Sequence, residues 1–234
     1  VDYMFSWHGN ADLIVAIIKL FEDLKNSEND IIDKGVQAIL LVEDSVRFYS
    51  TYLPELYKLI LKQSSEFLKE TLNEQQRKFR KRSRPKILLA TNLDDALQMY
   101  TRYRNNLLGV ISDVGFTVHK GDSADMEKLD AGIDLVKHIK ADNEKMPILL
   151  QSSQDSISAV AKELGVGFLR KYSKTLMLQL SDYIKEEFGF GDFVFRDANH
   201  VEYGRAANLK ELEAIIREVP DEVLLYVTSK NMLS

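Results

Sequence analysis

Four polar residues whose side chains could do chemistry lie at the ends of short apolar runs. Glu43 and Asp44 come directly after AILLV, Asp113 ends the stretch LLGVISD, and Lys171 follows VGFLR. The three carboxylates outnumber the single ammonium group, and carboxylates packed together without a cation raise one another's pKa. A divalent cation would neutralise the remaining charge. The pattern therefore predicts a site where Mg²⁺, which prefers oxygen ligands, meets a phosphoryl group.

The residue types fit the separate roles of phosphoryl capture. A carboxylate can attack phosphorus as a nucleophile and form an acyl phosphate. Asp113 is the candidate, because its apolar run is the strongest and is expected at the centre of a sheet. Ser152, at the end of PILLQS, offers a hydroxyl to the new phosphoryl group. Lys171 would pair with the phosphoryl oxygens as a point charge.

Each residue also has an ordinary structural role open to it. Glu43 and Asp44 could cap the helix that follows them, and Ser152 could be a helix N-cap. Lys171 taken alone would be a surface lysine. The functional interpretation therefore depends on the ordered set and on the elements that bring it together.

Five apolar runs must position these residues. Near-continuous apolar runs are typical of parallel strands buried on both faces, and helix-like stretches separate the five. The alternation predicts an α/β fold with a doubly wound, five-stranded parallel sheet, in which ligands bind beyond the carboxyl ends of the strands. The expected strands are 36–42, 86–90, 107–112, 147–151 and 166–170.

Composition narrows the class of protein. The 234 residues are 45% hydrophobic and 29% charged, as expected for one or two globular domains. The chain has no cysteine, which excludes disulfides and fits a reducing compartment, so we expect a cytoplasmic protein. A net charge of -5 argues against nucleic-acid binding. The N-terminal apolar stretch 13–21 is too short to cross a membrane.

Two flanking parts surround the predicted sheet domain, residues 36–188. Residues 1–35 are expected to form a strand at 3–7 and an amphipathic helix from about residue 11 to 25. Residues 189–234 form an extension with a strand in FGFGDFVF, a helix that begins after Asn208 and ends before Pro220, and a final amphipathic segment.

The first helix of the domain is predicted to be unusually long. Apolar residues recur at helical spacing from residue 45 to 82, with a kink or interruption at Pro54. Seven lysines and arginines with no acidic residue among them fall between 77 and 86. They suit a solvated helix end, where cations favour the helix dipole, and a docking patch for an acidic partner is the alternative.

Residues 36–188 resemble a response regulator receiver domain of the CheY-like class. The stretches ILLVEDS, VISD, MPILLQSS and GVGFLRK stand in the family's order, and Gly132 in AGIDLVKHI matches the glycine that opens the family's third helix. The resemblance implies a two-component phosphorelay, in which Asp113 accepts a phosphoryl group from a histidine kinase or phosphotransfer protein. It further implies regulation of an attached or partner output domain.

The resemblance also implies ligands and a switch. Mg²⁺ would be bound directly by Asp44 and Asp113, through water by Glu43, and by the backbone carbonyl of Gly115. Phe168 matches the family's aromatic switch position, although a phenylalanine there is also a plain core residue.

Two features depart from the family pattern. Tyr172 follows Lys171 where the family has proline, so we expect a trans peptide bond and a reshaped loop, because a cis bond before a residue other than proline costs roughly 2.5–4 kcal/mol. The loop between Asp113 and Gly132 is longer than usual and could cover the site.

The flanks carry a weaker resemblance. FSWHGNADLIVAIIKLFED looks like the end of a preceding receiver-like domain. The stretches VEDSVRFYS, RPKILLA, FGDFVFRD and VPDEVLLYV look like the region before the kinase domain of large bacterial phosphoenolpyruvate synthase-like proteins. That resemblance implies a regulatory segment of an ATP-dependent phosphotransferase. The long helix and the flanks are, separately, candidate homodimer surfaces.

Three functions therefore compete. The leading one is a phosphoacceptor receiver. The alternative is a pseudo-receiver that acts without phosphorylation as a docking or dimerisation module of the phosphoenolpyruvate synthase-like enzyme. A phosphatase with an aspartyl intermediate would need a DxD pattern, but Gly115 takes the second acidic position, so the chain itself is not expected to be an enzyme.

Overall fold

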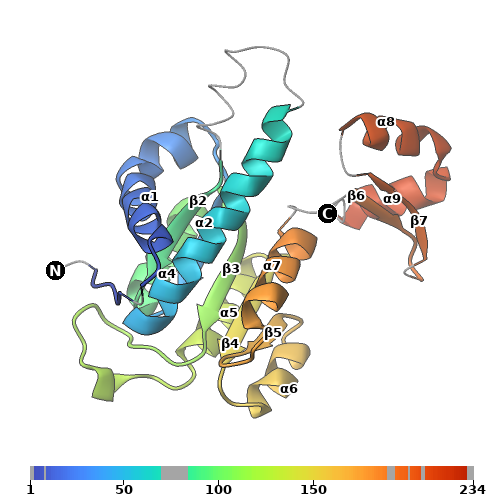
Figure 1. Cartoon of the computed structure of the whole chain (residues 1–234). Coiled ribbons are helices and arrows are strands. Elements are labelled where there is room, and N and C mark those ends of the chain that lie inside the picture. Colours follow the sequence, from blue (N-terminus) through green and yellow to red (C-terminus); the bar gives the residue numbers. More distant parts are fainter. Residues whose placement is uncertain are drawn as a thin grey trace. The chain divides into compact units, whose positions relative to one another are not determined.

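The computed structural model describes residues 3–7, 9–69, 84–188, 193–199, 201–206 and 209–230. Contacts divide the chain into two compact units, residues 1–177 and 178–234 (Figure 1). Among the described helices, none is both long enough and apolar enough to cross a membrane.

The first unit is built on a five-stranded parallel sheet. Its strands are β1 Ala38–Val42, β2 Lys86–Ala90, β3 Leu107–Asp113, β4 Ile148–Ser152 and β5 Gly167–Arg170. The strand order is β2-β1-β3-β4-β5, and every neighbouring pair is parallel. The expected doubly wound sheet is confirmed, with its change of winding direction between β1 and β3, where such folds bind ligands.

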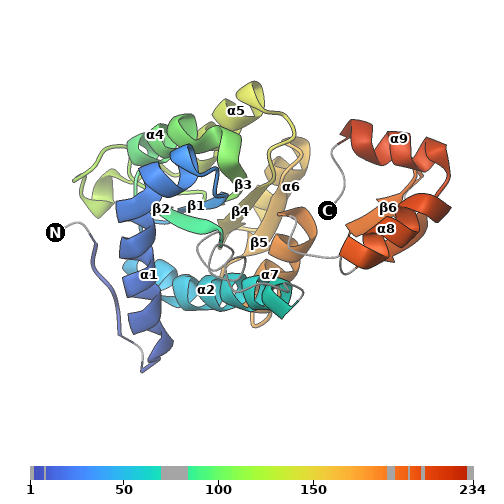
Figure 2. The ribbon, with the colours of Figure 1, turned by 90° about the horizontal axis from the view of Figure 1, so that it is seen from above.

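Helices cover both faces of this sheet. They are α2 Val46–Lys69, α4 Leu93–Tyr103, α5 Ala131–Asp142 and α6 Ser156–Glu163. Seen from above, α4 and α5 lie on one face and α2 on the other (Figure 2). Leu40, Val110 and Leu150 of the sheet pack with Tyr100 and Leu135 of the helices in one buried core. Each such side chain stabilises the fold by roughly 1.5–3 kcal/mol.

Helix α1, Asp12–Ser27, covers the outer edge of β2 and packs against α2. The backbone N–H of Ile87, which points away from β1, donates a hydrogen bond of 3.1 Å to the Asp23 carboxylate. The Tyr3 hydroxyl donates one of 2.8 Å to the carbonyl of Leu89. Open strand edges invite pairing with other chains, so this arrangement protects the sheet.

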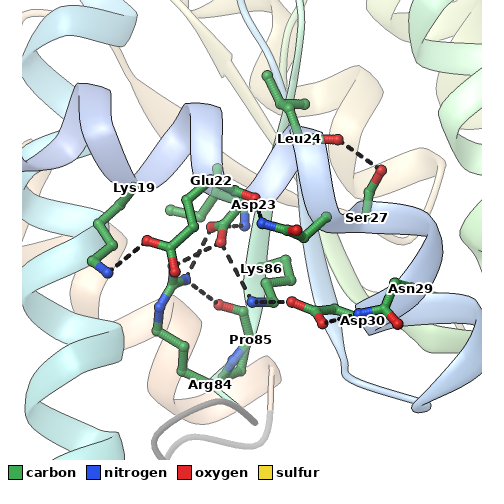
Figure 3. A network of polar contacts seen from close by, with 12 residues as sticks. Lys19, Glu22, Asp23, Leu24, Ser27, Asn29, Asp30, Arg84, Pro85 and Lys86 are labelled. Carbon is green, nitrogen blue, oxygen red and sulfur yellow. Dashed lines mark hydrogen bonds and ion pairs between the residues drawn. The ribbon is translucent and has the colours of Figure 1, made fainter.

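A buried ionic network holds α1 in place (Figure 3). Asp23, fully buried, accepts hydrogen bonds of 2.6 and 2.9 Å from Arg84 and one of 2.8 Å from the Tyr57 hydroxyl. Lys86 lies 2.8 Å from Asp30. Burial, with Asp23 next to it, raises the pKa of Tyr57, which therefore stays a donor. Buried charges are tolerated when paired in this way.

Two of the seven predicted basic residues thus have a different role from the one expected. Arg84 and Lys86 are buried partners of Asp23 and Asp30 rather than part of a solvated helix end. The other five lie outside the described residues, as does the expected helix beyond residue 69. Within the described part, α2 continues through Pro54, whose missing N–H leaves the helix one hydrogen bond short.

The expected strand at residues 3–7 is wrong. This segment is extended but pairs with no strand of the described chain. The Ser6 N–H donates to the Ser50 hydroxyl at 3.0 Å, and the Tyr49 hydroxyl donates to the carbonyl of Met4. Its backbone groups are therefore bonded to side chains of α2, while α1 occupies the edge of β2 that a strand would need.

The second unit contains α7 Leu176–Glu187, which begins at the end of the first unit, an antiparallel pair β6 Phe193–Arg196 and β7 Glu202–Ala206, and helices α8 Leu209–Glu218 and α9 Asp221–Lys230. Phe195, Val219, Val223 and Val227 form its buried core. The strand in FGFGDFVF and both helices are confirmed. Strand β7 was not expected, because EYGRA has no apolar run.

Candidate functional site

Strand ends bring the five polar candidates together. Glu43 and Asp44 follow β1, Asp113 ends β3, Ser152 ends β4 and Lys171 follows β5, so all lie at the carboxyl edge of the sheet. A pocket of about 300 Å³ opens there. Its lining includes Asp44, Asp113, Glu127, Ser152, Lys171 and Tyr172.

Lys171 joins two of the carboxylates. Its Nζ lies 2.5 Å from Asp113 Oδ2 and 2.8 Å from Glu43 Oε2, and its side chain is only 5% exposed. Burial alone would lower the pKa of Lys171, but the carboxylates of Glu43 and Asp113 outweigh it and raise the pKa. The lysine is therefore a fixed cation, not a surface residue.

The carboxylates fit a hard divalent cation. One oxygen from each of Glu43, Asp44 and Asp113 lies within 4.8 Å of the others. Burial, together with the charge of Asp113, raises the pKa of Glu43 to about 8 and that of Asp44 to about 6, and Glu127 contributes to the shift of Asp44. An oxygen-bound cation would relieve this repulsion, and oxygen donors in such a set suit Mg²⁺ or Ca²⁺.

Backbone contacts orient the acidic side chains. The N–H of Val114 donates to Asp113 Oδ1 at 2.7 Å, and the N–H of Ser45 donates to Glu43 Oε1 at 3.2 Å. Glu43 thus both pairs with Lys171 and holds the chain before α2. Gly132 lets α5 begin against the end of β3, since a Cβ there would lie 2.1 Å from the carbonyl oxygen of Asp113.

Ser152 links two strand ends. Its carbonyl accepts the N–H of Lys171 at 2.9 Å, and its hydroxyl accepts the N–H of Gln154 at 3.1 Å. The hydroxyl therefore organises the turn before α6, as an N-cap would, and it still faces the pocket. Phe168, in β5, is half-buried and packs against the core between the sheet and α4 and α5.

Tyr172 reshapes the wall of the pocket. No described residue has a cis peptide bond, so the Lys171–Tyr172 bond is trans, as expected. Tyr172 has a φ of 66°, the left-handed region that non-glycine residues seldom adopt. Its ring is 66% exposed and packs edge to face on Phe48, with ring centres 5.2 Å apart.

Sequence reasoning missed the aromatic residues beside the lysine. Lys171 Nζ lies 4.1 Å from the centre of the Phe48 ring, close enough for a cation–π interaction. Phe48 stacks on Tyr52, whose buried hydroxyl has no hydrogen-bond partner among the described residues. Phe48 and Tyr52 are apolar residues of α2, and nothing in the sequence distinguishes them from residues that only fill the core.

Glu127 was also missed. It belongs to the long loop after Asp113, yet it lines the same pocket. A Cβ on Gly115 would lie 2.3 Å from Glu127 Oε1, so the carboxylate occupies the space beside that glycine. The length of the loop was the only signal in the sequence. It predicted that the loop could cover the site, but not which of its residues would reach the pocket.

Comparisons with known proteins found similar solved structures. No protein-family model and no curated protein matches the chain. A response regulator receiver domain protein from Clostridium thermocellum is 19% identical, covering 66% of this chain and 95% of that one, with a TM-score of 0.43. Vibrio cholerae chemotaxis protein CheY4 is 17% identical over 62% and 95%, with a TM-score of 0.41. The non-phosphorylated HemR receiver domain from Leptospira biflexa is 22% identical over 63% and 94%, with a TM-score of 0.39.

The strand order defines the class independently of these matches. A parallel sheet ordered β2-β1-β3-β4-β5 is the flavodoxin-like form of the doubly wound fold, to which CheY-like receivers belong.

Proposed function

We propose that the chain is a receiver module of a two-component phosphorelay, in which Asp113 accepts a phosphoryl group in the presence of Mg²⁺. The observation that carries the proposal is the placement of Lys171 between Asp113 and Glu43, at the carboxyl ends of the neighbouring strands β1 and β3. An acceptor carboxylate, a fixed cation and a cation-binding acidic pair then share one edge of the sheet.

The chain's own residues supply the parts of the transfer. An oxygen of Asp113 attacks phosphorus, a P–O bond forms to the carboxylate, and the bond to the donor's leaving group breaks. Lys171 would exchange its contact with Asp113 for one with a phosphoryl oxygen, and the Ser152 hydroxyl would donate to another. Mg²⁺, held by Asp44, Asp113, the Gly115 carbonyl and, through water, Glu43, would offset negative charge during the transfer.

The donor would be a histidine kinase or a phosphotransfer protein, and the readout would be a change in the population of two surface states. An output domain, a switch at Phe168 and dimerisation through α2 or the flanks are part of this proposal. The chain would accept and signal rather than turn over a substrate.

Intact mass after incubation with acetyl phosphate and MgCl₂ tests the proposal. We expect one added phosphoryl group in the wild-type chain and none in Asp113→Asn. Asp33→Asn, at an exposed site far from β3 in sequence, should be labelled like the wild type. No added mass in the wild type, or labelling that survives Asp113→Asn, would refute the acceptor role.

The docking-module alternative is distinguished by metal binding. No described contact favours it over phosphoryl acceptance, and the phosphoenolpyruvate synthase-like parent stays a prediction from the flanks. Calorimetric titration with MgCl₂ separates the two. Binding in the millimolar range or tighter supports the receiver, whereas no binding there supports a pseudo-receiver that acts through its surface alone.

A further inference from the structure

A fourth carboxylate reaches the pocket from outside the strand ends. Glu127 lies in the loop between β3 and α5, and its Oε1 occupies the position where a side chain on Gly115 would begin. It lines the pocket together with Asp113. The inserted loop therefore supplies an acid at a point where the strand end itself carries glycine.

The loop holds this residue in place on both sides. The N–H of Lys128 donates to the carbonyl of Phe116 at 3.0 Å, and the N–H of Phe116 donates to the carbonyl of Lys128 at 3.3 Å. The Lys128 side chain also pairs with Asp134 on α5. An acid next to this two-way bridge has a fixed backbone, which is what a positioning role requires.

Glu127 itself is exposed, and it forms no hydrogen bond or ion pair with any residue that the structure describes. It also stands outside the group formed by Glu43, Asp44 and Asp113, whose oxygens come within 4.8 Å of one another. A carboxylate with free lone pairs at the mouth of a pocket is an acceptor for water.

We infer that Glu127 positions the water that hydrolyses the acyl phosphate on Asp113 and so sets the lifetime of the phosphorylated state. This inference rests on the proposed phosphoryl acceptance at Asp113. The water oxygen attacks phosphorus, its proton passes to the Glu127 carboxylate and then to solvent, and the bond between phosphorus and the Asp113 oxygen breaks. The products are the free Asp113 carboxylate and inorganic phosphate.

The test compares decay of the phosphorylated full-length chain after removal of acetyl phosphate, followed by intact mass. We expect Glu127→Gln, which keeps the shape of the side chain, to lengthen the half-life about tenfold, less than the roughly 10²–10⁴-fold that a full general base contributes. Glu144→Gln, an exposed site before the amino-terminal end of β4, is the matched control and should decay like the wild type.

A second variant moves the acid without removing it. In Gly115→Ala the new Cβ displaces the flexible end of Glu127, while the backbone carbonyl of residue 115 is kept. We expect slower decay here as well. Thermal unfolding of Glu127→Gln should match the wild type, which separates positioning from a purely structural effect.

The outcomes separate the two ideas. Labelling of Asp113 with equal half-lives in the wild type and Glu127→Gln would overturn the role of Glu127 and leave the receiver proposal standing. Faster labelling of Glu127→Gln with unchanged decay would also overturn it, because the residue would then only repel anionic donors. A wild-type chain that takes up no phosphoryl group would refute both.

Discussion

At the pocket, one ammonium group faces more negative charge than it can balance. Lys171 pairs with Glu43 and Asp113, while Asp44 and Glu127 have no such contact with it among the described ion pairs. The raised pKa values of Glu43 and Asp44 follow from burial and from this excess of like charge. Proton binding and metal binding therefore compete for the same oxygens.

Mg²⁺ affinity should accordingly rise with pH. The pKa is raised to about 8 for Glu43 and to about 6 for Asp44. Both side chains therefore hold protons in the metal-free protein at pH values where free carboxyl groups are ionised. Each proton that must leave weakens binding, so we expect the affinity to increase by up to about tenfold per pH unit between pH 6 and 8. Calorimetry at several pH values measures it.

Glu43→Gln is the control for that series. The variant removes the carboxyl group that titrates at the higher pH. Mg²⁺ affinity should then rise only where Asp44 loses its proton, at a pH of about 6. An affinity that does not change between pH 5 and 9 would show that neither proton competes with the metal.

Removing Lys171 should lower the stability of the fold, because the buried carboxylates then have no positive charge beside them. In Lys171→Met, Glu43 loses its buried partner and its pKa rises further above the value of 4.5 for a free glutamate. A raised folded-state pKa gives stability that is complete below the unfolded-state pKa and is lost as pH rises through the folded-state pKa. The destabilisation should therefore be small at pH 5 and grow above pH 8, by up to about 1.4 kcal/mol per pH unit.

Urea unfolding at both pH values measures this difference. Lys174→Met, at an exposed site three residues further on, provides the comparison and should be close to neutral. Equal losses at pH 5 and pH 9 would mean that Lys171 acts through packing on Phe48 rather than through charge.

Much of the pocket was predictable at the residue scale because strand ends converge. Glu43, Asp44, Asp113 and Lys171 each follow an apolar run, and the periodicity of parallel sheets places such residues on one edge. Glu127 was not predictable, because its position depends on the path of a long loop, which leaves no periodic pattern.

At the scale of elements, α1 acts as the protecting edge of the sheet. Its Asp23 satisfies the outward N–H of Ile87, and the same carboxylate binds Arg84 and Tyr57. The helix and its amphipathic face are predictable from the sequence, but this role is not, because Asp23 looks like one more charge on a helix. Only the packing of α1 against β2 makes it a buried ion.

Asp23→Asn should therefore be costly. The change keeps the size of the side chain but leaves the Arg84 charge, which is 5% exposed, without a counter-ion. Breaking a buried pair by removing one partner typically costs about 3–5 kcal/mol. Denaturant unfolding should show a loss in this range, and the exposed neighbour Glu22→Gln should lose much less. A loss below about 0.5 kcal/mol would place the pair among weak surface salt bridges.

The junction of β3 and α5 requires a residue without a side chain at position 132. Gly132→Ala would put a Cβ 2.1 Å from the Asp113 carbonyl oxygen and 2.9 Å from Val114 Cα, both backbone atoms. The start of α5 must then move, and overpacking of this kind typically costs about 1–3 kcal/mol of stability. Labelling of Asp113 by acetyl phosphate should fall together with stability. Unchanged labelling would show that the acceptor tolerates a shift of its own strand end.

At the scale of the whole chain, the two units differ in how much of their fold can be predicted from the sequence. The first has a sheet of long apolar runs, so alternation alone gives the strand number and the fold class. The second depends on a short antiparallel pair in which Gly204 lets Ile215 of α8 approach. Contacts of this kind follow from packing and leave little trace in composition.

Each unit has its own buried core, and this predicts that damage to one spares the function of the other. Phe195→Ala removes the largest side chain of the core of the second unit. Such truncations cost about 3–5 kcal/mol, which a core this small can hardly withstand. Hydrogen exchange should report loss of protection in β6, β7, α8 and α9, while β1, β3 and β4 keep theirs. Mg²⁺ binding should stay at the wild-type level, because every proposed ligand lies between residues 43 and 115. A loss of binding together with protection in β3 would instead mean that the two cores unfold as one.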